Sequence, residues 1–337
     1  MAPKSGWRSY GTPTLSTGTL AASEFLLLSG ILFTSLAKAA RNYMLSTLNR
    51  GPAWKKLLRN WMPPGIIGLA QKALNYVGIV EWECAPEGWR SAAGVRGWNI
   101  PSVVDFQKLR WKAYADALSG TSALTINHEE PKNLNSGKLR DHNTLVTYAY
   151  VLALAARQKQ SVAVLDWGGG LGHYSLLSKS VLPDVHLEYY CHDLPLLCQA
   201  GREYSPGVRF VERRDDCFSR TYDLVLASSS LWYEEYWRGL VDELAAAANP
   251  YLYVTRMIFV DHASSYVAIQ RPRADSYRTE YLCWILNRQE FIDHAHSRGM
   301  QLVREFVISD AQYIFKAPEQ GSYKGFLFRK ANARSLS

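Results

Sequence analysis

The sequence has little of what would place it in several large protein classes. Its five cysteines are an odd number and include no CxxC pair, so neither a zinc ribbon nor a disulfide framework is indicated. No metal site is therefore expected, and a reducing compartment is the simplest interpretation. The apolar stretch at residues 25–37 has 13 residues, whereas a membrane-spanning helix needs about 20.

Acidic residues are scarce at the N-terminus. Residues 1–72 hold nine Lys or Arg and one Glu, so this segment carries the whole excess of a chain with net charge +8. The partner is either nucleic acid or an anionic membrane. WKKLLRNW at 54–61 has the pattern of an interfacial helix, which favours the membrane, although a packing helix with a solvated basic face fits as well. We therefore expect a cytoplasmic protein that lies peripherally on the inner membrane face, and no nucleic acid partner. Residues 25–37 also fit a signal-peptide core.

Strand and helix patterns alternate from residue 139 onward. Apolar strands are predicted at 161–167, 185–193, 208–215, 222–230 and 251–259, with helices between them, and two further strands close the chain at 301–309 and 325–330. This order predicts an α/β, doubly wound, mostly parallel, seven-stranded Rossmann-like sheet with an antiparallel last strand, preceded by an N-terminal helical region. The predicted parts are a basic segment at 1–72, a cap or lid at 73–138 and a ligand-binding domain at 139–331.

A glycine-rich loop, VLDWGGGLGHYS at 164–175, follows the first of these strands. It lacks the Gly-Lys-Ser/Thr of a phosphate-binding loop. It also lacks the third glycine of a dinucleotide fingerprint, because that place holds His173 or Ser175. The pattern that fits is DxGxGxG. Its members are Asp166, Gly168, Gly170 and Gly172.

The charges of S-adenosyl-L-methionine suit this loop. An acid at the strand end, Asp166, can meet its ammonium group, and the glycines let the backbone pass beside its methionine portion, with the first helix amides facing its carboxylate. Asp193, at the end of the next strand, can accept both ribose hydroxyls. It fits equally well as a cap of the helix that Pro195 begins.

Acids also follow the third strand, in RRDDCF. An acid there can accept from the adenine amino group, with an apolar neighbour against the ring. The candidates are Asp215, Asp216, Cys217 and Phe218. The two acids also fit an ordinary turn. Since ligands of open α/β sheets bind at the carboxyl ends of the strands, the order of these signals favours the cofactor interpretation.

These motifs resemble those of class I S-adenosylmethionine-dependent methyltransferases over about residues 139–330. Asp193-Leu194-Pro195 with RRDDCF downstream resembles the motifs of small-molecule O-methyltransferases. LDWGGGLGHYS, RDHN at 140–143, Gln270-Arg271-Pro272 and YLCWI at 281–285 resemble an uncharacterised bacterial methyltransferase family that often accompanies surface-polysaccharide genes. The resemblance implies methyl transfer to a small-molecule, sugar or lipid-linked acceptor at oxygen. It adds Leu194 and Ser228 to the cofactor residues.

Two other functions fit the same sequence. One is an NAD-dependent oxidoreductase, against which the incomplete fingerprint argues. The other is a non-catalytic, membrane-associated protein that keeps a cofactor-binding fold. The basic leader is compatible with this second function but does not require it.

The sequence departs from the O-methyltransferase pattern where those enzymes carry a catalytic histidine, because Trp232 stands at that place. Base catalysis is therefore not carried over by position. Three other histidines are candidates for a general base: His173, His262 and His142. Predicted acceptor-binding residues combine arginines and aromatics, which suit an anionic or sugar-bearing molecule. They are Trp232, Tyr233, Arg256, Gln270, Arg271, Tyr281 and Trp284.

Overall fold

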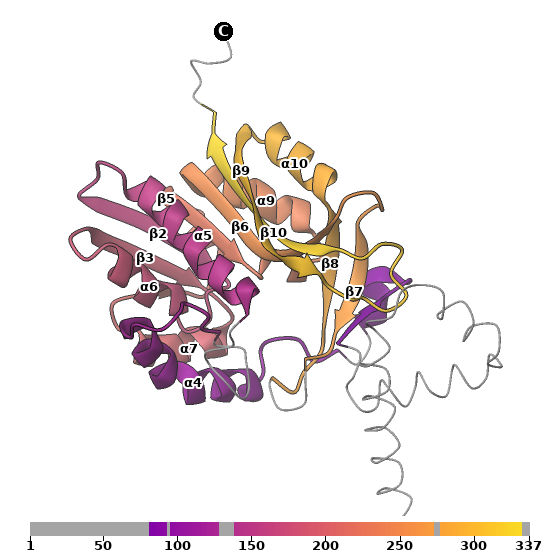
Figure 1. Cartoon of the computed structure of the whole chain (residues 1–337), viewed down its shortest axis with the longest axis horizontal. Coiled ribbons are helices and arrows are strands. Elements are labelled where there is room, and N and C mark those ends of the chain that lie inside the picture. The colour runs from indigo at the N-terminus through magenta and orange to yellow at the C-terminus, as the bar shows by residue number, and fades with distance from the viewer. Residues whose placement is uncertain (1–80, 93–94, 128–137, 273–276, 332–337) are drawn as a thin grey trace, which may run out of the picture. The chain divides into compact units, whose positions relative to one another are not determined.

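A mostly parallel sheet organises the part of the chain that this computed structural model describes, namely residues 81–92, 95–127, 138–272 and 277–331 (Figure 1). Seven strands form its main body: β2 (Ser161–Trp167), β3 (His186–His192), β4 (Arg209–Val211), β5 (Tyr222–Ser228), β6 (Ala248–Val260), β9 (Met300–Ala311) and β10 (Ser322–Lys330). Strands β4-β3-β2-β5-β6 are parallel neighbours, and β10 lies antiparallel to both β6 and β9. The predicted Rossmann-like sheet with an antiparallel last strand is confirmed.

Three further strands extend the sheet beyond the prediction. After β6 the sheet forks, because the end of β6 also pairs with β8 (Tyr281–Asn287). Strand β7 (Tyr266–Gln270) lies antiparallel to β8, and β1 (Trp82–Cys84) lies antiparallel to β7. Residues 261–284, for which no strand was predicted, thus largely belong to a β-hairpin.

Helices cover both faces of the sheet. They are α4 (Pro101–Ser119), α5 (Leu139–Ala156), α6 (His173–Val181), α7 (Pro195–Tyr204), α8 (Arg214–Cys217), α9 (Trp237–Ala247) and α10 (Arg288–Ser297), with short 3-10 turns η1 (Gly88–Ala92) and η2 (Leu231–Tyr233). Helices α5 and α6 share one core with the strands, and α9 and α10 share the other.

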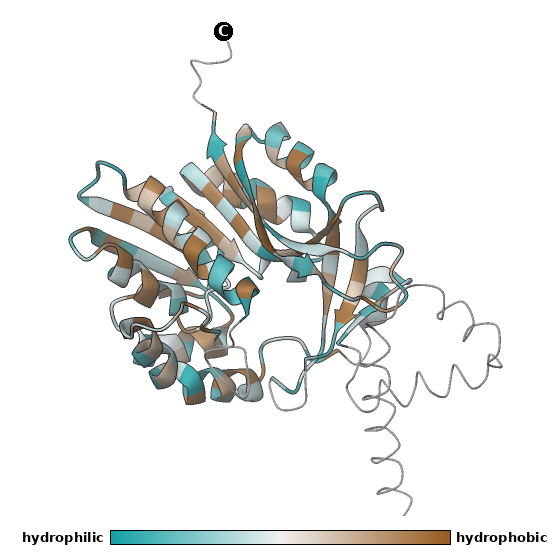
Figure 2. Ribbon diagram, in the orientation of Figure 1, coloured by the Kyte–Doolittle hydropathy of each residue, from teal (hydrophilic) through white to brown (hydrophobic). Residues whose placement is uncertain are grey.

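Alternate residues of each strand enter these two cores, as the strand pleat requires. Val164 of β2 and Leu226 of β5 pack with α5, whereas Leu165 and Val225 pack with α9. Since both faces are covered, the central strands are apolar along much of their length (Figure 2). This arrangement leaves the strand ends, and the loops that follow them, as the place for polar side chains.

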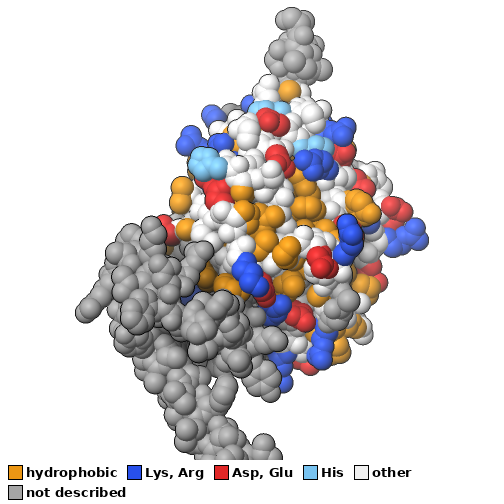
Figure 3. Space-filling view, turned by 90° about the vertical axis from the view of Figure 1, so that its right-hand side faces the viewer, with side chains coloured by type: hydrophobic (Ala, Val, Ile, Leu, Met, Phe, Trp, Pro, Cys, Tyr) orange, Lys and Arg blue, Asp and Glu red, His pale blue; other side chains and the backbone are white. Residues whose placement is uncertain are grey.

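The predicted basic segment 1–72 lies outside the described residues, and the predicted boundaries at 72/73 and 138/139 remain predictions. The described residues fall within one contact unit, Val80–Ser337. Among them, no helix has the length and apolar character needed to cross a membrane. On the face at the right of Figure 1, hydrophobic side chains gather between charged ones (Figure 3).

Candidate functional site

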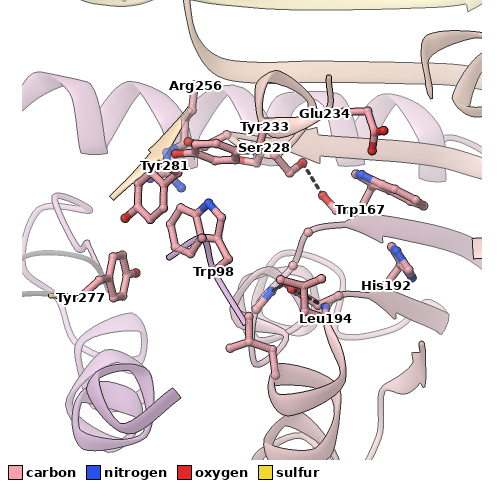
Figure 4. A pocket seen from close by; sticks show the side chains of 18 of the residues that line it. Trp98, Trp167, His192, Leu194, Ser228, Tyr233, Glu234, Arg256, Tyr277 and Tyr281 are labelled. Carbon is pink, nitrogen blue, oxygen red and sulfur yellow. Dashed lines mark hydrogen bonds between the residues drawn. The ribbon is translucent and has the colours of Figure 1, made fainter. Parts of the chain in front are cut away.

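A cavity of about 500 Å³ lies where the carboxyl ends of β2, β3 and β5 meet, beside Arg256 of β6 (Figure 4). The loops after these strands supply most of its floor, and α4 and the preceding segment supply a wall. Among its lining residues are Trp98, Gln107, Trp167, Gly168, Gly169, Gly170, His173, Tyr174, His192, Asp193, Leu194, Arg214, Ser228, Tyr233, Glu234, Arg256, Tyr277 and Tyr281. Open α/β sheets bind ligands at this edge.

The glycine loop needs glycine for backbone shape and for space. Gly168, Gly170 and Gly172 have φ of +74°, +60° and +85°, a region that other residues rarely adopt. A Cβ on Gly168 would lie 2.3 Å from the Cβ of Ser230, and one on Gly170 would lie 2.7 Å from the Oε1 of Gln107. The loop therefore lies close against its neighbours and presents backbone, not side chains, to the cavity.

Asp193 joins the end of β3 to this loop. Its Oδ2 accepts a hydrogen bond from the Gly170 amide, and its Oδ1 accepts one from the Leu194 amide, both at 2.7 Å. It does not cap α7, because that helix has Leu194 at the capping position and no side-chain cap. Burial raises the pKa of Asp193 to about 6, although the two amides act in the opposite direction. Each oxygen keeps a lone pair for a ligand hydroxyl.

Asp166 lies against the glycine loop without lining the cavity. It is 1% exposed, and its Oδ2 accepts from the Tyr189 hydroxyl at 2.9 Å. Its Oδ1 has no hydrogen-bond partner among the described residues. Burial raises the pKa of this carboxyl to about 7, with the Tyr189 hydrogen bond opposing the shift. The sequence placed Asp166 at the ligand itself, whereas the structure places it beside Gly169.

The RRDDCF motif reaches the cavity through a residue that the sequence did not single out. Asp215 and Asp216 lie exposed on α8 and do not line the cavity. Arg214 does line it, and its guanidinium pairs with Glu234 at 3.3 Å and Glu243 at 2.6 Å.

The apolar half of the motif packs behind the cavity wall. Phe218 stacks on Trp167 with ring centroids 5.3 Å apart, and the Cys217 side chain is buried. These two residues support the wall without lining it.

Of the three candidate histidines, the structure brings His173 alone to the cavity. It is buried between the rings of Trp111 and Tyr114, each 5.0 Å away. His262 is exposed, with its amide bonded to Glu319, and lies away from the cavity because β6 continues past the cavity edge. His142, in the first turn of α5, does not line it either.

A fourth histidine, His192, was missed. It lines the cavity and stacks on Trp167 at 4.0 Å, with its Nδ1 2.8 Å from the Val211 carbonyl. Burial lowers its pKa, so the ring is neutral at pH 7 and its Nε2 can accept. Its place directly before Asp193 at a strand end was the available signal.

A second cavity of about 560 Å³ adjoins the first. The two share a wall formed by Trp98, Ser229, Tyr233, Arg256, Tyr277 and Tyr281. Trp98 stacks on Tyr281 at 4.2 Å and meets Tyr233 edge-on at 5.1 Å (Figure 4). Trp98 was also missed as an individual residue. Its presence in a Trp-rich part of the expected lid was the only signal.

The predicted acceptor residues divide between this wall and positions behind it. Tyr233, Arg256 and Tyr281 line both cavities. Trp232 and Gln270 line the second only, and the Gln270 Oε1 accepts from the Tyr233 hydroxyl at 3.0 Å. The structure does not bring Arg271 and Trp284 to either cavity. Arg271 pairs with Glu83 and Glu280, and the Trp284 indole donates to the Glu235 carbonyl.

Arg256 owes its direction to a β-bulge. Between Lys324 and Phe326 of β10 the register with β6 shifts, so that two residues of β6 face Gly325 alone. Arg256 is one of these two, with φ +58° and 9% exposure. Bulges re-aim side chains, and strained backbone of this kind is concentrated at functional sites. Ser229, which directly follows β5 and lies beside this part of β6, also has a positive φ, of +56°.

No protein-family model and no curated protein sequence matches the chain. Solved structures do resemble it. The magnesium protoporphyrin IX methyltransferase of Synechocystis PCC 6803, crystallised with S-adenosylmethionine, is 12% identical, covers 70% of this chain and 100% of its own, and has a TM-score of 0.41. The 1,6-didemethyltoxoflavin-N1-methyltransferase of Burkholderia thailandensis is 14% identical, covers 74% of this chain and 91% of its own, and has a TM-score of 0.38. The cyclase SpnF is 13% identical, covers 68% of this chain and 97% of its own, and has a TM-score of 0.41. At these identities and TM-scores, the function of this chain is inferred from the residues of its own site.

Proposed function

We propose that this chain is an S-adenosylmethionine-dependent methyltransferase that acts on a small-molecule acceptor. The observation that carries the proposal is the bond between the Gly170 amide and the Asp193 carboxylate at the edge of the cavity. This bond joins Asp193, an acid that can hold a ribose, to a glycine loop that has no room for side chains. Such an edge suits a nucleoside with a zwitterionic tail.

The residues around the first cavity fit the cofactor. Asp193 would accept from the ribose hydroxyls, and the backbone of Gly168 to Gly170 would lie beside the methionine portion. The bound cofactor supplies an activated methyl group. The protein's main task is then to hold the acceptor in line and to exclude water. Ser228, whose Oγ lies 2.8 Å from the Tyr174 hydroxyl, and Arg256 stand on the side of this cavity that faces the second one.

We further propose that the acceptor occupies the second cavity and is a sugar-bearing molecule methylated at oxygen. Supporting this, the cavity combines stacking rings with side chains that exchange hydrogen bonds with hydroxyls, such as Asn127, Gln270 and Gln312. A lipid-linked glycan is the form of acceptor that the basic N-terminal segment would suit.

The direct test is calorimetric titration of the full chain with S-adenosylmethionine, followed by incubation with methyl-labelled cofactor and a cell extract. We expect a single site and a labelled small molecule with a new methyl ether. Absence of binding would overturn the proposal. Binding with no labelled product from any extract would instead favour the non-catalytic alternative, and a change in NADH fluorescence on mixing would favour the oxidoreductase.

Cofactor affinity should depend on pH through Asp193. Ribose hydroxyls donate to the ionised carboxylate, and burial raises its pKa to about 6. Below that pH the proton must be lost before binding, so affinity should fall by up to about tenfold per pH unit. Above pH 7 Asp193 is ionised and adds little further pH dependence. Titrations of S-adenosylhomocysteine between pH 5 and 8 would measure this, and a flat profile would contradict the assignment of Asp193.

A further inference from the structure

Helix α4 brings one polar side chain to the glycine loop. Gln107 is 4% exposed, lines the first cavity, and holds its Oε1 2.7 Å from where a Cβ on Gly170 would stand. This Oε1 has no hydrogen-bond partner among the described residues. A buried polar atom without a hydrogen-bond partner lowers the stability of the fold, so its presence indicates a role outside the fold.

The amide of Gln107 is not what holds α4 in place. Val103 and Val104 of this helix share a hydrophobic core with Leu171 and Leu197, and Trp111 packs on the His173 ring. Helix α4 is thus docked by apolar contacts on both sides of Gln107. The Oε1 of Gln107 makes no hydrogen bond among the described residues that would add to this docking.

A second acceptor oxygen beside the same loop also has no partner among the described residues. It is Oδ1 of Asp166, whose other oxygen would lie 2.4 Å from a Cβ on Gly169. The unpartnered Gln107 oxygen, at the cavity beside the loop and near the acid Asp193, favours a ligand group that only donates and carries positive charge. Asp166 does not line the cavity, so it would act on such a group through the charge of its ionised form and not by direct contact. An ammonium group has three donors and no acceptor.

We propose that Gln107 binds the α-ammonium group of the amino-acid portion of the cofactor through its Oε1. The inference rests on the proposed function and extends it. The helix that precedes the methyltransferase-like sheet would then supply a cofactor contact, and the amino-acid end of the ligand would lie between α4 and the glycine loop. Hydrogen bonds to charged groups are the strong ones, so this contact should be measurable in affinity.

The test compares two ligands that share the nucleoside. S-Adenosylhomocysteine carries the amino-acid portion, and 5′-methylthioadenosine does not. Calorimetry on the full chain should show that Gln107→Leu weakens S-adenosylhomocysteine by about tenfold or more and leaves 5′-methylthioadenosine unchanged. Gln107→Glu, which adds a negative charge, should bind S-adenosylhomocysteine at least as tightly as the unaltered chain. Gln289→Leu, on the exposed face of α10, is the matched control and should change neither.

Three results would overturn the inference while leaving the proposed function intact. The first is a Gln107→Leu variant that binds S-adenosylhomocysteine as tightly as the unaltered chain. The second is an equal loss for both ligands, which would mean that Gln107 holds α4. The third is weaker binding by Gln107→Glu, which would mean that the amide nitrogen meets the ligand carboxylate. Failure of the unaltered chain to bind either ligand would overturn the proposed function itself.

Discussion

Replacing Gly168 by alanine is expected to abolish detectable cofactor binding and to destabilise the fold. The added Cβ would meet the Cβ of Ser230 at 2.3 Å, and the backbone is held at φ +74°. Strain at such a φ and overlap in a packed region together cost roughly 2–4 kcal/mol of unfolding free energy. For a chain of this length this corresponds to a fall of about 3–7 °C in Tm. Thermal unfolding and calorimetric titration measure the two effects.

The control for this substitution is Gly239→Ala. Gly239 lies in α9, its added Cβ would meet nothing within 4 Å, and it does not have a positive φ. Because alanine favours a helix over glycine by up to about 1 kcal/mol, Tm should stay constant or rise, with binding unchanged. A Gly168→Ala variant that melts with the unaltered chain and keeps its affinity would show that the loop tolerates a side chain.

Local sequence signals predicted the central strands and the loop well, because they depend on neighbours in the chain. The apolar run ending at Trp167 is buried on both faces. A run of this kind predicts a buried strand without any knowledge of the helices that pack on it. The glycines at 168, 170 and 172 proved to need positive φ, which glycine alone adopts freely. By contrast, β1 forms through pairing between residues far apart in the chain, such as Trp82 with Gln270.

The walls of the cavities were less predictable for the same reason. Gln107 lies on a helix whose own pattern says nothing of Gly170, 63 positions later in the printed sequence. Asp215 and Asp216 follow a strand end as the motif requires. However, α8 turns these two acids outward and Arg214 toward the cavity. The rotation of α8 about its axis decides which side chain faces the cavity, and the position of the motif after a strand does not predict that rotation. Trp232 lines the second cavity only, and its buried indole donates to the Ser229 carbonyl.

Replacing Asp193 by asparagine should weaken cofactor binding by about a hundredfold or more. Asparagine has nearly the same shape, but one of its two positions donates instead of accepting. Both carboxylate oxygens of Asp193 now accept from backbone amides, so either Gly170 or Leu194 would lose its bond. The ribose hydroxyls would also lose a charged acceptor, and hydrogen bonds to charged groups contribute about 1.5–3 kcal/mol each. Calorimetry with S-adenosylhomocysteine measures the loss.

Asp223→Asn separates this effect from a general loss of stability. Asp223, at the opposite end of β5 from the cavity, also accepts from a backbone amide, that of Ala163, and from the Lys159 ammonium. Its substitution should lower Tm and leave cofactor affinity unchanged. Asp193→Asn should weaken cofactor affinity with a smaller fall in Tm, since burial disfavours the charged form of Asp193 and a neutral side chain offsets part of the cost of the lost backbone bond. If both variants lost stability and affinity together, Asp193 would serve the fold and not the ligand.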